Sequence, residues 1–222
     1  MHLIKHKWIK RIFVLILVIF ISYILYLNSL VKSQFSSEIE PKDNVVQIQN
    51  LIDDYPKELI NMLLLVEDQS FFDHIGVDFK EILRVLYGYL FEEKELRGAS
   101  TITQQLIKNT LLSRDKTLAR KTDEALMAIL MEMSYDKNFI LERYMNTVYL
   151  AQQGSTAIHG FASGSLHYFD KDVESLNLEE MATLVALLKG PSYYNPINSP
   201  EHLSRRVEMI LSMHKNYKKI IQ

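Results

Sequence analysis

The stretch LINMLLLVEDQSFFDHIG (residues 59–76) joins an unbroken apolar run to a cluster of acidic, aromatic and histidine side chains. Pro56, with acidic residues just before it, is typical of the first turn of a helix. We therefore expect a helix that is apolar on most sides and central to the core. Its last residues are Glu67 and Asp68, and acidic side chains are rarely buried unless they are paired or functional.

The position of these two acids favours a chemical role for one of them. The negative end of the helix dipole disfavours an ionised carboxylate there, which favours proton uptake by a general base. The alternative is that one acid is solvated and the other caps the next turn. The aromatic residues and Gly76 that follow indicate a stiff turn, which favours the functional interpretation.

Helical periodicity continues over most of the chain beyond residue 53. Asp78 and Glu81 have the spacing of a capping box, and an apolar face follows them up to Leu90. Further helices are expected within residues 100–112, 117–133, 136–150 and 177–191. Because no stretch shows convincing strand alternation, the body is predicted to be all-α.

Composition argues against a disulfide-bonded protein, a thiolate metal site and a nucleic-acid-binding protein. The 222 residues allow one domain of ordinary size plus an appendage, and the absence of cysteine excludes disulfides and thiolate metal sites. Five of the 25 Lys and Arg residues lie within residues 1–32, which contain no acid, so the remainder of the chain is acidic. An acidic body argues against nucleic acid as a partner, because phosphate backbones require a basic surface.

The N-terminus has the pattern of a membrane anchor. IFVLILVIFISYILYLNSLV (residues 12–31) is uncharged and close to the ~20 residues that a membrane-spanning helix needs. The basic residues within 1–11 predict that this end is cytoplasmic and that the body lies outside. Residues 32–52 are then a linker, and residues 53–222 form the domain outside the membrane. The alternative, a cleaved signal peptide, would need a short apolar region and a small-residue cleavage site, and neither is present.

A second polar cluster, GASTITQQLIKN (residues 98–109), precedes and begins another predicted helix. Thr101 and Gln104 have capping-box spacing, and neighbouring side chains add hydroxyl and amide groups. A helix N-terminus of this kind offers hydrogen-bond donors to an anion, and Lys108 lies two turns on, along roughly the same face. The alternative is a well-capped surface helix without a ligand.

The segment LARKTDEALMA (residues 118–128) places two cations and a carboxylate on one helix face. Arg120 and Lys121 precede Glu124 by four and three residues, which is the spacing of neighbours on a helix surface. This face is either a solvated charged surface or a carboxylate held among cations that attract a phosphate.

The segment ILERYMNTVYL (residues 140–150) is the fourth polar pattern, because Glu142 and Asn146 share one helix face. Tyr144, Val148 and Tyr149 are expected in the core rather than in a platform for a ligand. The histidines show no H-E-x-x-H spacing, so the sequence does not support a zinc site.

In this order the motifs resemble those of the peptidoglycan glycosyltransferases, the enzymes of glycosyltransferase family 51 that polymerise lipid II. Residues 67–76 match E-D-x-x-F-x-x-H-x-G, and residues 98–109 match G-[GA]-S-T-[IL]-T-Q-Q-L-x-K-N. The remaining matches are R-K-x-x-E-x-x-x-A at 120–128, E-x-Y-[LM]-N-x-x-Y at 142–149 and K-G-x-S-x-Y-N-P at 189–196. The resemblance covers about residues 55–200. A chain without a transpeptidase domain resembles the monofunctional members.

The resemblance implies a lysozyme-like helical fold and a specific reaction. Glu67 would take the proton from the 4-hydroxyl of the acceptor sugar, whose oxygen attacks the anomeric carbon of a lipid-linked strand. The anomeric centre is inverted and undecaprenyl pyrophosphate leaves. Glu124 would lie near the leaving group, and the apolar segment 86–91 would dip into the bilayer.

The resemblance also implies a set of side chains that line the phosphates and sugars of the substrate. These are Arg84, Ser100, Thr101, Gln104, Gln105, Lys108, Lys116, Arg120, Lys121 and Asn146. A divalent cation, Mg²⁺ or Mn²⁺, often assists at the pyrophosphate in the family, but the sequence contains no ligand set for it.

The chain departs from the family pattern at a few positions. Lys116 stands where the family often has Arg, so a point charge replaces a bidentate fork. Leu150, Ala151 and His159 also depart from the usual residues. All of these positions lie outside the two carboxylates, so we expect an effect on efficiency rather than on the reaction.

The family resemblance further implies a location and partners. It places the chain in the bacterial inner (cytoplasmic) membrane as a single-pass protein, with its catalytic domain on the extracytoplasmic (periplasmic) side. Its partners would be lipid II, the growing lipid-linked glycan strand and other cell-wall synthesis proteins.

Two alternatives remain open from the sequence. A lysozyme-like lytic enzyme would act on the same polymer, but it would not need the phosphate-directed cations Lys108, Arg120 and Lys121. A non-catalytic, membrane-anchored scaffold would bind cell-wall precursors without needing both Glu67 and Glu124.

Overall fold

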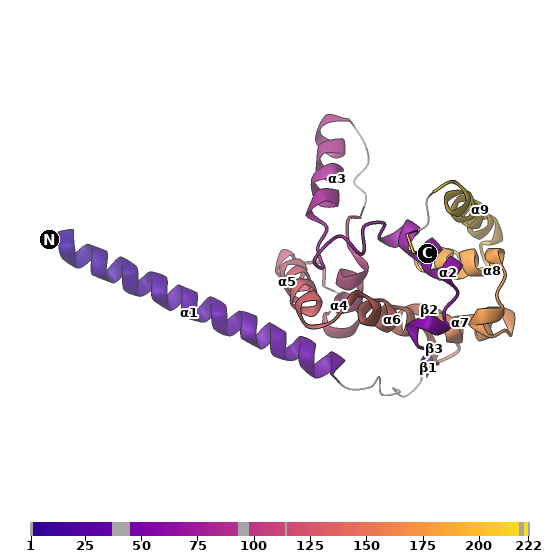
Figure 1. Cartoon of the computed structure of the whole chain (residues 1–222), viewed down its shortest axis with the longest axis horizontal. Coiled ribbons are helices and arrows are strands. Elements are labelled where there is room, and N and C mark those ends of the chain that lie inside the picture. The colour runs from indigo at the N-terminus through magenta and orange to yellow at the C-terminus, as the bar shows by residue number, and fades with distance from the viewer. Residues whose placement is uncertain (1, 37–44, 93–97, 114, 218–219, 222) are drawn as a thin grey trace.

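The computed structural model describes residues 2–36, 45–92, 98–113, 115–217 and 220–221. Within them, a helical body carries two projecting helices, α1 (His2–Phe35) and α3 (Phe79–Phe91), as Figure 1 shows. The predicted fold class, a helical domain preceded by one N-terminal apolar helix, is confirmed.

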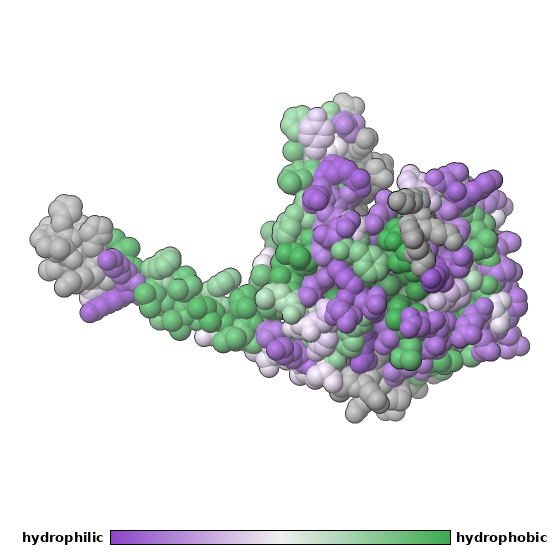
Figure 2. Space-filling model, viewed as in Figure 1, coloured by the Kyte–Doolittle hydropathy of each residue, from purple (hydrophilic) through white to green (hydrophobic). Residues whose placement is uncertain are grey.

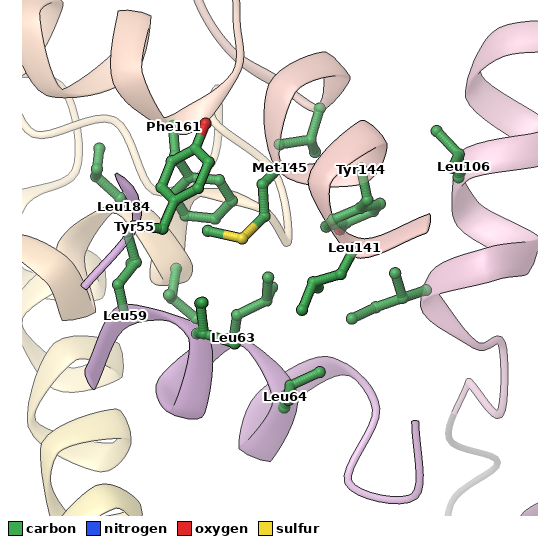
Figure 3. Packing of buried hydrophobic residues seen from close by; sticks show 14 of the residues in the cluster. Tyr55, Leu59, Leu63, Leu64, Leu106, Leu141, Tyr144, Met145, Phe161 and Leu184 are labelled. Atoms are coloured by element: carbon green, nitrogen blue, oxygen red, sulfur yellow. The ribbon is translucent and has the colours of Figure 1, made fainter. Parts of the chain in front are cut away.

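The central helix of the body is α2 (Lys57–Glu67), as the apolar run predicts. Leu63 and Leu64 are fully buried in the main hydrophobic cluster, part of which Figure 3 shows. Complete burial of one such side chain contributes roughly 1.5–3 kcal/mol. The helices packed against α2 are α8 (Leu178–Leu187) and α9 (Pro200–Asn216). The carboxyl end of α2 is thereby held rigidly at the edge of the core.

Three helices form the neighbouring part of the body, and each begins at a side-chain cap. They are α4 (Ile102–Leu111), α5 (Leu118–Ser134) and α6 (Lys137–Thr147). Thr101, Thr117 and Asp136 each accept a hydrogen bond from the backbone N–H three residues on. Helix α4 packs against both α5 and α6, so the polar motifs carried by these helices lie on adjoining elements. Helix α7 (Phe161–Phe169) and the short 3₁₀ turn η2 (Val173–Ser175) follow the sheet described next.

A small three-stranded sheet departs from the expectation of an all-α body. Its strands are β1 (Val45–Gln47), β2 (Tyr149–Gln153) and β3 (Thr156–His159), in the order β1-β3-β2. Strands β2 and β3 form an antiparallel hairpin, and β1 pairs with β3 in parallel. Strands of three to five residues are too short to produce a recognisable alternation, so tertiary pairing decides their conformation.

The predicted linker, residues 32–52, has more structure than expected. Helix α1 continues to Phe35, and β1 and a 3₁₀ turn, η1 (Ile52–Asp54), follow; residues 37–44 lie outside the described residues. Side chains of α6 bind the backbone here: Asn146 accepts from Asn50 N–H at 3.0 Å, and Glu142 accepts from Ile52 N–H at 2.9 Å. The fourth polar pattern therefore holds this segment against the body.

The two projecting helices expose apolar surface (Figure 2). Residues Trp8–Phe35 of α1 are long and apolar enough to cross a membrane. On α3, Leu83, Leu90 and Phe91 are 65%, 59% and 72% exposed. Apolar side chains at this density on an isolated helix indicate a surface that meets an apolar phase.

Candidate active-site groove

An open groove of about 680 Å³ runs along the carboxyl end of α2. One wall is formed by the loop that follows α2 and by the first turns of α3, up to Arg84. The segment from Gly98 to Thr101, which leads into α4, and Met213 of α9 also line the groove. The first two predicted motifs therefore line the same groove.

Glu67, the last residue of α2, presents a partly exposed carboxylate to this groove. Its Oε2 accepts a 2.9 Å hydrogen bond from Nε2 of Gln105 on α4. The carbonyl of Gln105 in turn accepts from the Tyr144 hydroxyl of α6 at 3.1 Å. Among the described residues no cation pairs with Glu67, so its remaining oxygen can accept a hydrogen bond from a bound hydroxyl.

Asp68 lies next to Glu67 but faces the interior. It is 7% exposed, and Oδ2 accepts hydrogen bonds from His74 Nε2 at 3.0 Å and from the Ile102 N–H at 2.8 Å. The N–H of Gly76 donates to His74 Nδ1, which leaves Nε2 as the protonated, donating nitrogen. The prediction that the start of α4 offers its amides to an external anion is wrong for Ile102, because Asp68 already occupies that position.

The loop between Asp68 and Asp78 is held by a buried network rather than by its own regularity. Lys137 donates to the His74 carbonyl at 2.8 Å and to Glu132 at 2.7 Å. Its ammonium also lies 4.5 Å from the ring centre of the buried Phe71. Phe71 and His74 of the first motif therefore stabilise the loop that lines the groove, through their contacts with Lys137.

Gly76 is the point where this loop meets α5. Its φ of +93° is a conformation that side chains with a Cβ rarely adopt. An added Cβ would lie 2.5 Å from the backbone oxygen of Ala128, so no side chain fits there. The Thr101 hydroxyl donates to the Gly76 carbonyl at 2.6 Å. Gly76 thus ties the Glu67 loop to both α4 and α5.

Glu124 lies on α5 in a cluster of charges and is only 1% exposed. Its Oε2 accepts from Arg120 at 2.7 Å, and its Oε1 pairs with Lys121. The Lys121 ammonium also donates to the Ser100 hydroxyl at 2.8 Å. Ser100 lines the groove, as Glu67 does, so the cluster of Arg120, Lys121 and Glu124 adjoins the groove through Ser100 without lining it.

Three predicted cationic residues are solvent-exposed. The Arg84 side chain is 75% exposed, lines the groove and pairs with Glu81 on α3. Lys108 on α4 and Lys116 between α4 and α5 are also exposed. Neither lysine forms an ion pair within the described part of the chain. Their roles toward substrate stay predictions.

Three other predicted binding residues are engaged inside the fold. Thr101 and Gln104, both 2% exposed, close the capping box of α4 on each other. Asn146 bonds to Asn50 and to the Tyr55 hydroxyl, and it does not line the groove. These three side chains therefore form hydrogen bonds within the fold. Any contact that they make with substrate stays a prediction.

Tyr144 is the site residue that sequence reasoning missed. Burial raises its pKa well above the usual value, and the charges of Glu67 and Asp68 act in the same direction. The hydroxyl therefore stays neutral and donates to Gln105, which fixes the amide so that its N–H points at Glu67. A tyrosine on the buried side of a helix gives no local signal of such a contact.

No group of three His, Asp or Glu side chains within the described residues could hold a metal ion. One or two carboxylates together with substrate phosphates can hold Mg²⁺, so the divalent cation stays a prediction.

Comparison with known proteins identifies the class. A family model described as Transglycosylase matches residues 33–215. Penicillin-binding protein 1B of Haemophilus influenzae is 41% identical over 178 residues, which cover 80% of this chain and 23% of that protein. Penicillin-binding protein 1B of Escherichia coli is 42% identical over 159 residues, 72% of this chain and 19% of that protein.

A third relative, penicillin-binding protein 1A of Neisseria lactamica, is 45% identical over 161 residues, which cover 72% of this chain and 20% of that protein. The chain thus spans about a fifth of the length of these relatives. The family match covers most of the chain and includes the residues that line the groove. The chain belongs to the transglycosylase family, the peptidoglycan glycosyltransferases of glycosyltransferase family 51.

Proposed function

We propose that this chain is a membrane-anchored peptidoglycan glycosyltransferase that polymerises lipid II and releases undecaprenyl pyrophosphate. The observation that carries the proposal is that Glu67 and Ser100 line one groove and that Ser100 bonds to a cation of the Glu124 cluster. Glu67 is a carboxylate with no cation partner among the described residues, and Ser100 accepts a hydrogen bond from Lys121.

Glu67 acts as the general base. The free oxygen of Glu67 accepts the proton of the acceptor 4-hydroxyl. The oxygen of that hydroxyl then forms the new bond to the anomeric carbon of the donor strand. A general base positioned in this way contributes about 10²–10⁴-fold to the rate. Gln105 holds the carboxylate by its other oxygen, so the proton-accepting oxygen has a fixed direction.

Arg120 and Lys121 supply positive charge for the leaving group. As the bond between the anomeric carbon and the phosphate oxygen breaks, negative charge grows on the diphosphate, and fixed cations stabilise it. Glu124 keeps the two cations in position without being exposed itself. A divalent cation would be held mainly by the diphosphate of the substrate and would offset its negative charge.

Helix α1 anchors the chain in the bacterial cytoplasmic membrane, with the body on the extracytoplasmic side. The basic residues in the N-terminal part of α1 support this orientation, and the exposed apolar face of α3 supports contact of the body with the lipid surface. A lipid-linked substrate then reaches the groove without leaving the bilayer.

The test uses the purified full chain in detergent or vesicles with labelled lipid II, beside Glu67→Gln. Glycan polymer from the wild type and a loss of at least about 100-fold in the variant would support the proposal. Shortening of preformed glycan would instead support a lytic enzyme, and binding without turnover a scaffold. Either of those outcomes overturns the proposal.

A further inference from the structure

Helix α1 is joined to the catalytic body along a single stripe. Leu27, Val31 and Phe35 are spaced by four residues, and each is at most 4% exposed in the main core cluster. Tyr23 precedes Leu27 by four residues and so lies in the same stripe. Its hydroxyl donates a hydrogen bond to the carboxylate of Asp123 on α5. Helix α5 is also the main partner of α1 among the helices.

The element that receives this stripe carries the proposed leaving-group cations. Asp123 immediately precedes Glu124, and Arg120 and Lys121 lie one turn before them. A helix moves as a unit, so the position of α1 sets the position of this charge cluster.

The length of α1 then sets the height of the cluster relative to the bilayer. Arg11 and Tyr23 are twelve residues apart, which corresponds to a rise of about 18 Å. The hydrocarbon core is about 30 Å thick. With Arg11 at the cytoplasmic interface and α1 along the bilayer normal, the Tyr23–Asp123 contact lies about 18 Å from that interface, just beyond the midplane.

We propose that Tyr23 is a positioning residue: its bond to Asp123 fixes the height of the Arg120–Lys121–Glu124 cluster relative to the bilayer. This inference rests on the proposed function, because only a membrane-bound substrate makes that height matter. Tyr23 does not touch the reacting atoms and acts through α5.

The first experiment measures kcat and KM for labelled lipid II with the full chain in phosphatidylethanolamine–phosphatidylglycerol vesicles and in detergent micelles. The variants are Tyr23→Phe, Asp123→Asn, their double mutant and the control Tyr26→Phe. Tyr26 is 58% exposed, three residues on along α1. Loss of one hydrogen bond predicts about a 5-fold fall in kcat/KM in vesicles for Tyr23→Phe, with no further fall in the double mutant.

The comparison of vesicles with micelles separates positioning from stability. In micelles no bilayer plane defines a height, so Tyr23→Phe is expected to match the control. An equal loss in both media, or no difference from Tyr26→Phe in vesicles, would overturn the inference. If the wild type itself makes no polymer, the proposed function fails instead.

A second experiment reads the height directly and needs no turnover. Because the chain has no cysteine, Leu118→Cys accepts a single fluorophore; Leu118 is 89% exposed and lies at the start of α5. Quenching by lipids with nitroxides at the headgroup or in mid-chain reports its depth. We expect Tyr23→Phe to change the ratio of shallow to deep quenching and Tyr26→Phe to leave it unchanged; an unchanged ratio in both overturns the inference.

Discussion

Glu67 and Glu124 are the two carboxylates proposed to act in catalysis, and their surroundings differ in exposure, in partners and in charge. Glu67 is partly exposed and accepts one hydrogen bond from a neutral amide. Glu124 is 1% exposed and contacts two cations. A carboxylate held by a neutral donor is free to exchange a proton, whereas one paired twice with cations serves to hold those cations. One carboxylate is therefore proposed to accept a proton, and the other is proposed to position two cations.

The largest effect is expected where the two surroundings meet, at Gly76. Gly76→Ala combines a positive φ with a Cβ placed 2.5 Å from the Ala128 oxygen, so the Glu67 loop and the Glu124 helix must separate. We expect a loss of about 3 kcal/mol or more in the free energy of unfolding, measured by urea denaturation. The control is Gly98→Ala, where a Cβ meets nothing within 4 Å. Equal stability of the two variants would contradict this assignment.

The next effect separates the roles of the two acids. Glu67→Gln and Glu124→Gln are both expected to reduce polymerisation by about 100-fold or more. Only Glu124→Gln should also destabilise the fold, by roughly 1–3 kcal/mol, because it leaves Arg120 and Lys121 without their buried counter-charge. Lys121 is 45% exposed, so part of the loss is offset by water. Thermal unfolding beside the activity assay checks this, and matching midpoints for the two variants would refute the division of roles.

A smaller effect is expected behind Glu67. Tyr144→Phe removes the donor to the Gln105 carbonyl, so the amide can rotate and release Glu67. We expect kcat to fall about 5-fold, in proportion to one hydrogen bond, with little change in KM. Tyr149→Phe is the control, since Tyr149 is 36% exposed at the start of β2. The expectation that Tyr149 lies in the core is wrong, because its strand turns the side chain to the surface. A rise in KM with an unchanged kcat would show instead that Tyr144 contributes to substrate binding.

Local signals predicted most of the fold. The apolar run before Glu67 predicted the central helix, and Thr101 and Asp78 predicted the caps of α4 and α3, because helix starts depend on neighbours in sequence. The sheet depends on pairing between β1 and β3, which are more than 100 residues apart, and no local pattern reports it. The continuation of α1 into the core was missed for the same reason.

The site was predicted in parts rather than as a whole. The motifs pointed to Glu67 and to the helix face of Glu124, since each lies within one short segment. The contacts that give them direction join distant segments, as Gln105 does with Glu67 and Asp68 with Ile102. Which acid of the adjacent pair faces the groove follows from packing around α4, and sequence spacing carries no information about it.

The smallest expected effect concerns the wall on the Glu67 side. Asp78 caps α3 and accepts hydrogen bonds from Ser70 and from the Glu81 N–H at 2.8 Å. Burial opposes its charge, but these hydrogen bonds prevail and lower its pKa below the usual 3.8. A lowered pKa means that this carboxylate stabilises the fold above about pH 4 and loses that contribution as the pH falls through its folded pKa.

Asp78→Asn isolates this contribution, because asparagine is also a good N-cap but does not titrate. Near pH 7 we expect the two proteins to differ by less than about 1 kcal/mol. Between pH 4 and pH 2.5 the wild type should lose thermal stability more steeply than the variant, as Asp78 takes up a proton and releases Ser70. Parallel curves would mean that Asp78 does not hold α3 to the loop. The loop beside Glu67 would then be stabilised by the Lys137 network alone. Glu67 and Glu124 would in that case both be positioned through α5 and α6.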